Sequence, residues 1–164
     1  MSAFVIDAFE FCRSNGSRDG VKPVAEMTRL TKDCADTSGT ITWNVAGGSS
    51  KHGYPQMRLS VAGTVQLVCQ RCLNPYAHQI DASTLLMLGK DDDQADEIEE
   101  LLDDDTIDVI VGTRSMDLLD LVEDEALLAL PHTPKHDVCP DSAPLDATAS
   151  EKKSPFAGLK DLKK

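Results

Sequence analysis

Two pairs of soft metal-binding side chains carry the clearest chemical potential in this sequence. Cys69 and Cys72 are separated by two residues in the segment CQRC, and His136 and Cys139 have the same spacing in HDVC. Zinc prefers four sulfur or nitrogen ligands in a tetrahedron, and a CxxC turn directs two thiolates at one point. If the chain brings the two pairs together, they form a Cys3His zinc site.

Other interpretations of the same cysteines stay open on the sequence alone. The two pairs are 63 residues apart, which is far from the spacing of a standard zinc finger. Without metal, Cys69 would be a small buried apolar residue and Cys72 a turn residue. A redox role would need a thiol activated at a helix N-terminus, whereas CQRC runs into Leu-Asn-Pro. His78 and His132 are spare ligands for the zinc interpretation.

Signatures of catalysis are missing from the sequence. It contains no P-loop, GxGxxG, GxSxG or HExxH motif. His132 and His136 flank a proline-rich turn near Asp137, but the sequence places no Ser or Cys nucleophile to use them as a base. We therefore expect a non-enzymatic protein without a small-molecule substrate. A hydrolytic or nucleolytic enzyme ranks third, after the two hypotheses that close this subsection.

The elements that position the first cysteine pair are predicted to be strands. Apolar and polar residues alternate over residues 57–69, which is typical of a half-buried strand with Cys69 on the core side. Residues 76–88 are rich in β-forming residues and predict an antiparallel partner, so CQRC would lie at a hairpin tip. Less regular segments predict further strands at 41–46 and 106–111, and either a strand or a short helix at 2–12.

Residues 115–130 predict the principal helix. Ser115 can cap its start, apolar residues recur at steps of three and four, and Pro131 ends it. The fold class is therefore predicted to be α+β, a small antiparallel β-sheet with this one helix packed on it. We expect one such domain over residues 1–145, followed by a polar linker and a flexible basic tail over 146–164.

The net charge of −12 comes almost entirely from one stretch. Residues 91–150 hold two Lys/Arg against nineteen Asp/Glu, whereas residues 151–164 hold five against two. Residues 91–108 carry eleven acidic and no basic residues, which favours an exposed acidic loop with at most a frayed helix around Ile98–Leu102. Such a stretch repels RNA and attracts basic proteins. Aromatic residues are only 4%, so stacking platforms for single-stranded nucleic acid are not expected.

The location predicted from the sequence is cytoplasmic. No apolar run approaches the ~20 residues that cross a bilayer, and the N-terminus lacks the pattern of a signal peptide. The five cysteines form an odd set, which fits a reducing compartment. We therefore expect no membrane partner.

Three segments carry a resemblance to a known family. These are VCQRCLNPYAHQI (68–80), DLVEDEALLALPHTPKHDVC (120–139) and SPFAGLKDLKK (154–164). In this order they resemble the YceD-like family of bacterial large ribosomal RNA subunit accumulation proteins. The resemblance implies a role in the synthesis, processing or stability of 23S ribosomal RNA, without a known catalytic activity. The genes of this family often neighbour that of a large-subunit ribosomal protein, which would be small and basic.

The first hypothesis is therefore a ribosome-biogenesis factor that binds a basic ribosomal protein or assembly factor, with rRNA contacted directly or only indirectly. The second is a zinc-binding or thiol-regulatory module that uses Cys69, Cys72, His136 and Cys139. Candidate binding residues for the first hypothesis lie at the hairpin tip, in the predicted helix and in the basic tail, namely Arg71, Glu123, Asp124, Glu125, Lys163 and Lys164.

Overall fold

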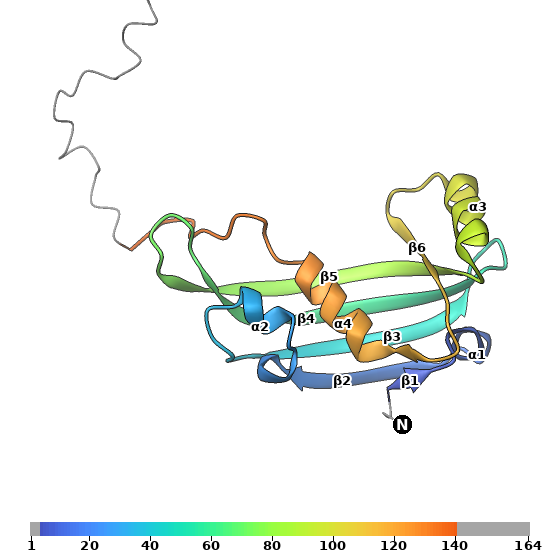
Figure 1. Ribbon diagram of the computed structural model, residues 1–164, viewed down its shortest axis with the longest axis horizontal. Helices are drawn as coiled ribbons and strands as arrows, with labels where there is room; N and C mark the ends of the chain where they lie inside the picture. The colour runs from blue at the N-terminus through green and yellow to red at the C-terminus, as the bar shows by residue number, and fades with distance from the viewer. Residues whose placement is uncertain (1–3, 141–164) are drawn as a thin grey trace, which may run out of the picture.

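The protein is built around one long, twisted sheet (Figure 1). A computed structural model describes residues 4–140 of the chain. The five strands lie in the order β2-β3-β4-β5-β6. Their bounds are β2 Ser17–Pro23, β3 Thr40–Ser49, β4 Pro55–Val68, β5 Pro75–Gly89 and β6 Ile107–Val111.

The central hairpin is the longest feature of the sheet and confirms the predicted strand pair. β4 has 14 residues and β5 has 15, and they pair antiparallel from Gln56↔Met87 to Val68↔Pro75. The alternation seen in the sequence is real burial: five apolar residues of β4 face the core, namely Met57, Leu59, Val61, Val65 and Leu67. The turn between the strands contains CQRC, as predicted.

The last strand departs from the predicted antiparallel sheet, because β6 runs parallel to β5. A parallel neighbour needs a crossover connection, and here α3, Asp92–Leu102, supplies it. The prediction of an acidic loop was therefore wrong. Asp91 caps the helix by accepting a hydrogen bond from the Gln94 amide, and Ile98 is fully buried, while the carboxylates face water. Water and salt screen the repulsion between the exposed carboxylates, so the Asp91 cap and the burial of Ile98 together outweigh it.

The predicted principal helix is α4, Leu118–Leu128, and it lies across one face of the sheet (Figure 1). Its buried face carries Leu118, Val122 and Ala126, with the spacing read from the sequence. The helix begins three residues later than predicted, because Met116–Asp117 form β7, which pairs with β1, Val5–Ile6. Asp117 caps the helix instead of Ser115.

The N-terminal segment contains both of the elements that its sequence allowed. β1 is followed by α1, Ala8–Arg13, and a short 3-10 turn, Val24–Glu26, precedes α2, Leu30–Asp33. One apolar core under α4 joins these pieces to the sheet.

The α+β class is confirmed. The predicted tail at 146–164 lies outside the described residues, and no helix within residues 4–140 is long and apolar enough to cross a membrane.

Candidate functional site

The hairpin turn after β4 places Cys69 and Cys72 on the same side of the loop. The Cys69 amide donates to the Asn74 carbonyl at 3.0 Å, and the Leu73 amide donates to the Cys69 carbonyl at 2.9 Å. Leu73 adopts a left-handed backbone, with φ of 61°, which is uncommon for a bulky residue. This conformation closes the turn and leaves the Leu73 side chain 75% exposed. Cys69 itself is fully buried.

The second pair reaches the turn because the chain folds back after α4. Pro131 follows the helix, and the Pro134 carbonyl accepts a hydrogen bond from the Gln70 amide at 2.8 Å. The His136 ring lies 5.1 Å from the Tyr76 ring, measured between centroids. The segment 131–139 is thus held against the hairpin by a backbone contact between the two cysteines and by a ring contact after them.

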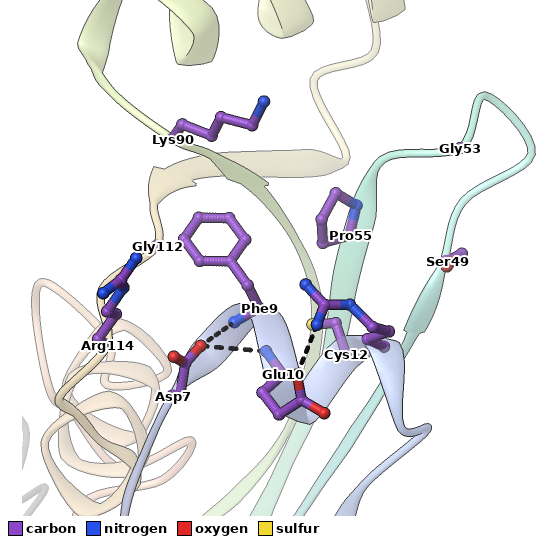
Figure 2. A pocket seen from close by; sticks show the side chains of 11 residues that line it. Asp7, Phe9, Glu10, Cys12, Ser49, Gly53, Pro55, Lys90, Gly112 and Arg114 are labelled. Carbon is purple, nitrogen blue, oxygen red and sulfur yellow. Dashed lines mark hydrogen bonds and ion pairs between the residues drawn. The ribbon is translucent and has the colours of Figure 1, made fainter.

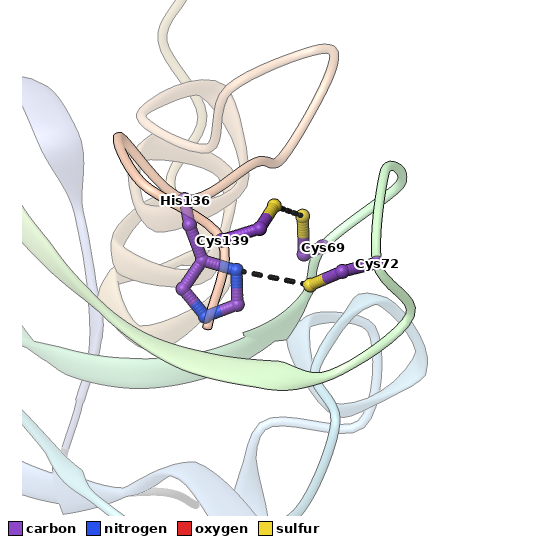
Figure 3. A group of neighbouring side chains, drawn as sticks. All are labelled: Cys69, Cys72, His136 and Cys139. Carbon is purple, nitrogen blue, oxygen red and sulfur yellow. Dashed lines mark hydrogen bonds between the residues drawn. The ribbon is translucent and has the colours of Figure 1, made fainter. Parts of the chain in front are cut away.

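The two pairs meet in one cluster, called here the Cys3His cluster, of Cys69, Cys72, His136 and Cys139 (Figure 3). Their four ligand atoms lie within 4.8 Å of one another. The Cys69 and Cys139 Sγ atoms are 3.8 Å apart, and Cys72 Sγ lies 3.3 Å from His136 Nδ1. A tetrahedral zinc ion would separate two sulfurs by about 3.8 Å, and a sulfur from a nitrogen by about 3.6 Å. The residues present therefore fit a closed four-ligand metal site.

Hydrogen bonds favour the thiolate form of Cys69. Burial raises the pKa of Cys69, but hydrogen bonds from the backbone of Cys72, His136 and Arg71 outweigh it and lower the pKa to about 5. For Cys139, burial is the larger effect and raises the pKa, although Arg71 opposes it. Of these two thiols, Cys69 therefore loses its proton more readily. A thiolate is the form that ligates metals.

Arg71 belongs to this cluster more than to the open surface. Its Nε donates to Cys139 Sγ at 3.0 Å, and its NH2 group donates to the His136 carbonyl at 2.9 Å. The hydrogen bond to Cys139 raises the Arg71 pKa further above its usual value. Arg71 thus neutralises thiolate charge while it fixes the second ligand pair to the hairpin.

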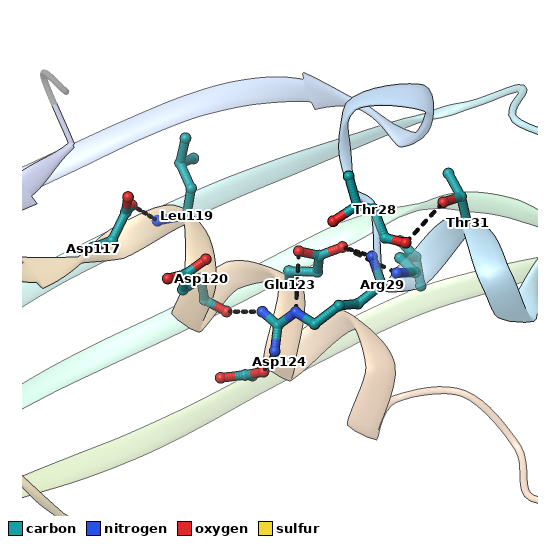
Figure 4. Close-up of polar contacts among 9 residues, drawn as sticks. Thr28, Arg29, Thr31, Asp117, Leu119, Asp120, Glu123 and Asp124 are labelled. Carbon is teal, nitrogen blue, oxygen red and sulfur yellow. Dashed lines mark hydrogen bonds and ion pairs between the residues drawn. The ribbon is translucent and has the colours of Figure 1, made fainter.

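Glu123 on α4 points towards Arg29 (Figure 4). It is buried, with only 7% of its surface exposed. It accepts hydrogen bonds from the amides of Arg29 and Leu30 at 2.7 and 3.0 Å and from Arg29 Nε at 3.3 Å. Burial raises the pKa of Glu123, but these bonds outweigh it and lower the pKa. The carboxylate thereby joins α4 to the start of α2.

Arg29 is a structural residue that the sequence did not reveal. Its guanidinium also pairs with Asp124 and donates to the Asp120 carbonyl at 3.0 Å. A lone arginine in a segment without periodicity gives no signal that it will meet an acidic helix some 90 residues later. Because Arg29 forms an ion pair with Asp124, part of the predicted acidic site on α4 already has a partner within the chain.

Glu125 lies beside a groove between α3, β6 and α4. Burial raises the pKa of Glu125, and the nearby Asp108 adds to the effect. Four carboxylates line this groove, which we call the acidic groove: Glu99, Asp108, Asp124 and Glu125. Lys163 and Lys164, the predicted basic contacts, lie outside the described residues.

A larger hollow of about 840 Å3 lies next to α1, at the end of the sheet away from the hairpin tip (Figure 2). Asp7 in its wall caps α1, and Glu10 pairs with Arg13 at 2.6 Å. Cys12 donates to the Gln56 carbonyl at 3.2 Å, and burial raises the pKa of its thiol. These side chains have structural partners and do not form a nucleophile with a base.

The fold and the cluster define a class of protein: an α+β domain in which a hairpin tip and the segment after the main helix join to present three thiols and an imidazole. Residues 57–163 match the family described as "Large ribosomal RNA subunit accumulation protein YceD". The chain therefore belongs to the YceD family, and the resemblance seen in the sequence is confirmed.

One curated relative shows how far this similarity extends. The protein "Large ribosomal RNA subunit accumulation protein YceD" of Haemophilus influenzae is 33% identical over 121 residues, which cover 66% of this chain and 68% of the relative. No solved structure gives a significant match. The family match contains the whole Cys3His cluster, α3 and α4, but it leaves out β2 and β3. The two candidate sites thus lie within the part of the chain that defines the family.

Proposed function

We propose that this chain is a non-catalytic ribosome-biogenesis factor that acts in the cytoplasm on the accumulation of large-subunit ribosomal RNA. It would do so by binding a basic ribosomal protein or assembly factor, so that its contact with RNA is indirect. Membership of a family described by large ribosomal RNA subunit accumulation supports the process. The acidic surface of α3 and α4 supports the kind of partner.

The main support for a basic partner is the unpaired negative charge on α3. Its carboxylates are exposed, and within residues 4–140 none of them forms an ion pair with Lys or Arg. They follow one another along the helix at Asp92, Asp93, Asp96, Glu97, Glu99 and Glu100. A surface of one sign attracts a partner of the opposite sign and repels polyanions. A basic protein satisfies this surface, whereas bare RNA does not.

The test is co-purification of the tagged full chain from its own cells after nuclease treatment. We expect a ribosomal protein or assembly factor rich in Lys and Arg to be retained at ~0.05 M salt and released at ~0.5 M, because salt screens exposed charges. The control is the same chain with Asn and Gln in place of Asp96, Glu97, Glu99 and Glu100. If no such protein is recovered at low salt, the proposed function is wrong.

A second candidate property is a structural zinc site, and the mutual distances in the Cys3His cluster favour it. Four protein ligands leave no open position, which is typical of structural zinc. A bound zinc ion would supply a cross-link between the hairpin tip and the segment 131–139. The chain itself prepares the site by aiming a backbone amide at sulfur, because the Arg71 amide donates to Cys69 Sγ at 3.4 Å.

Metal analysis of the full chain, purified without chelator, tests the zinc candidate. We expect about one equivalent of zinc, as four-ligand sites of this type bind one ion. Recovery of less than about a tenth of an equivalent, in protein that remains reduced, would exclude it.

A further inference from the structure

The acidic groove follows the free edge of the sheet. It encloses about 630 Å3, and four consecutive residues of β6, Ile107 to Ile110, line it. Successive side chains of a strand point to opposite faces, so lining by all four residues fits a groove that opens along the edge of that strand. In the described part of the chain, β6 pairs only with β5, and its other edge has no strand partner.

The floor of this groove is apolar and its rim is acidic. Leu86, Leu121 and Leu127 contribute to the floor. Four carboxylates, from three different elements, stand around it: Glu99 on α3, Asp108 on β6, and Asp124 and Glu125 on α4. Of these four carboxylates, only Asp124 forms an ion pair with a residue of the described range 4–140. The groove therefore combines buried apolar area with negative charge that lacks a cation.

The apolar surface continues beyond the groove. A neighbouring hollow of about 580 Å3 shares Leu127 and Leu128 with it and extends to Val68 and Leu73 at the hairpin. Leu128, at the junction of the two hollows, is 79% exposed. Adjoining exposed apolar side chains with a polar rim mark interaction sites more often than chance exposure does.

We propose that the acidic groove binds a segment of the partner protein in which apolar side chains alternate with Lys or Arg, held extended along the free edge of β6. The apolar side chains would lie on Leu121 and Leu128, and the cations would meet Asp108 and Glu125. A sheet edge supplies backbone hydrogen bonds for an added strand, while pockets beside it select the side chains. This inference rests on the proposed function, since it names where and how the basic partner is held.

The charge of the groove favours a basic polypeptide segment over nucleic acids, lipid surfaces and a second copy of the chain. Nucleic acids and anionic lipid surfaces would bring phosphate against four carboxylates. A second copy of the chain, with a net charge of −12, would place one acidic rim against another. A basic polypeptide segment is the class that satisfies both the apolar floor and the acidic rim.

The test is photo-cross-linking of the full chain in its own cells, with a benzophenone-bearing amino acid at one position at a time. Leu128 and Glu99 report on the groove. Val21 is the matched control, because it is 63% exposed and lies on β2, the opposite edge strand. We expect a protein rich in Lys and Arg to cross-link at both groove positions at least about tenfold more than at Val21. The combined changes Asp108→Asn and Glu125→Gln should lower that yield about threefold, in the range of two exposed charge pairs.

The outcomes separate this inference from the proposed function. If a basic ribosomal protein or assembly factor cross-links at Val21 as strongly as at Leu128, the groove is not its site, while the proposed function stands. If no basic protein cross-links at any position and none co-purifies, both fail. Cross-links from Leu128 to residues 141–164 of the same chain, to a second copy or to RNA would overturn the occupant named here.

Discussion

The Cys3His cluster takes two of its ligands from the segment that follows α4, whereas the acidic groove is lined by α4 itself, and the two regions are built on different principles. The cluster is internal: Cys69 and Cys139 are buried, and neighbouring ligand atoms lie 3.3 to 3.8 Å apart. The groove is open, and its carboxylates come from three elements without a common bond. Specificity at the cluster therefore depends on the position of single atoms, whereas at the groove it depends on summed charge and apolar area.

This difference predicts how each region responds to substitution. Loss of one metal ligand removes a large part of the binding free energy, because the remaining ligands cannot complete the tetrahedron. Loss of one exposed carboxylate changes binding only slightly, because salt and water screen each charge.

The largest expected effect is on metal content. The combined changes Cys69→Ser and Cys139→Ser should lower bound zinc from about one equivalent to less than about a tenth, because hydroxyls are poor zinc ligands compared with thiolates. Elemental analysis of the purified full chain measures this. The control Cys34→Ser removes a half-buried cysteine outside the cluster and should leave the zinc content unchanged. Equal zinc in both variants would contradict the site.

Glu123→Gln tests the hydrogen bonds that join α4 to the start of α2. The change should lower the free energy of unfolding by about 2 kcal/mol, because hydrogen bonds to a charged acceptor are worth about 1.5–3 kcal/mol and the amide can accept only part of them. Urea denaturation followed by circular dichroism gives the value. Glu10→Gln, at an exposed ion pair of α1, should cost less than about 0.5 kcal/mol.

The same variant predicts a dependence on pH. Bonds from Arg29 and Leu30 lower the pKa of Glu123 below its ordinary value of 4.5, so its stabilisation is fully present above that value. It is lost as the pH falls through the lowered pKa of the folded state. The stability difference between the wild-type chain and Glu123→Gln should therefore be constant from pH 6 to 7 and shrink in acid below 4.5. A difference that grows in acid would contradict this role.

Arg71→Lys sharpens the contrast within the cluster. The planar guanidinium donates to Cys139 Sγ and to the His136 carbonyl together, which one ammonium group cannot do in the same geometry. We expect zinc affinity to fall about tenfold, as for other residues that orient metal ligands. Competition with a chromophoric chelator measures the affinity. Arg58→Lys on β4 is the control. Equal zinc affinity for both variants would contradict the role of Arg71 in orienting the cluster.

The smallest effect is predicted at the groove. Asp108→Asn alone should weaken binding of the basic partner by about twofold at low salt, and by less at about 0.5 M salt, because the contribution of one exposed charge is small and screened. Quantitative co-purification across a salt series measures this. Asp19→Asn, at an exposed position of β2, should leave binding unchanged. A loss of binding that does not depend on salt would show that charge is not the cause.

The regular parts of the fold could be predicted because burial leaves a period in the sequence. The alternation over β4 and the three- and four-residue spacing in α4 are direct records of which face is buried. The crossover helix α3 could not be predicted in this way. Its only fully buried residue is Ile98, so the local composition indicated a solvated loop while a distant contact decided the structure.

The candidate site shows the same division. The types and spacing of Cys69/Cys72 and His136/Cys139 suggested a shared ligand set, but only the fold shows that the 63-residue interval closes. Glu123 could be selected by its charge, yet its partner Arg29 lies in a segment whose sequence carries no periodic signal. Long-range pairing of this kind is set by topology, and a single sequence does not record it.

The most direct test of the account is the ratio of large-subunit to small-subunit ribosomal RNA in cells whose only copy of this chain lacks four of the six carboxylates of α3. The variant carries Asn or Gln in place of Asp96, Glu97, Glu99 and Glu100, and it retains Asp91 as the helix cap. We predict that the ratio falls to that of cells lacking the chain, while Asp19→Asn keeps the normal ratio. A normal ratio with this variant, in cells where deletion of the chain lowers the ratio, would contradict the claim that the acidic surface performs the function.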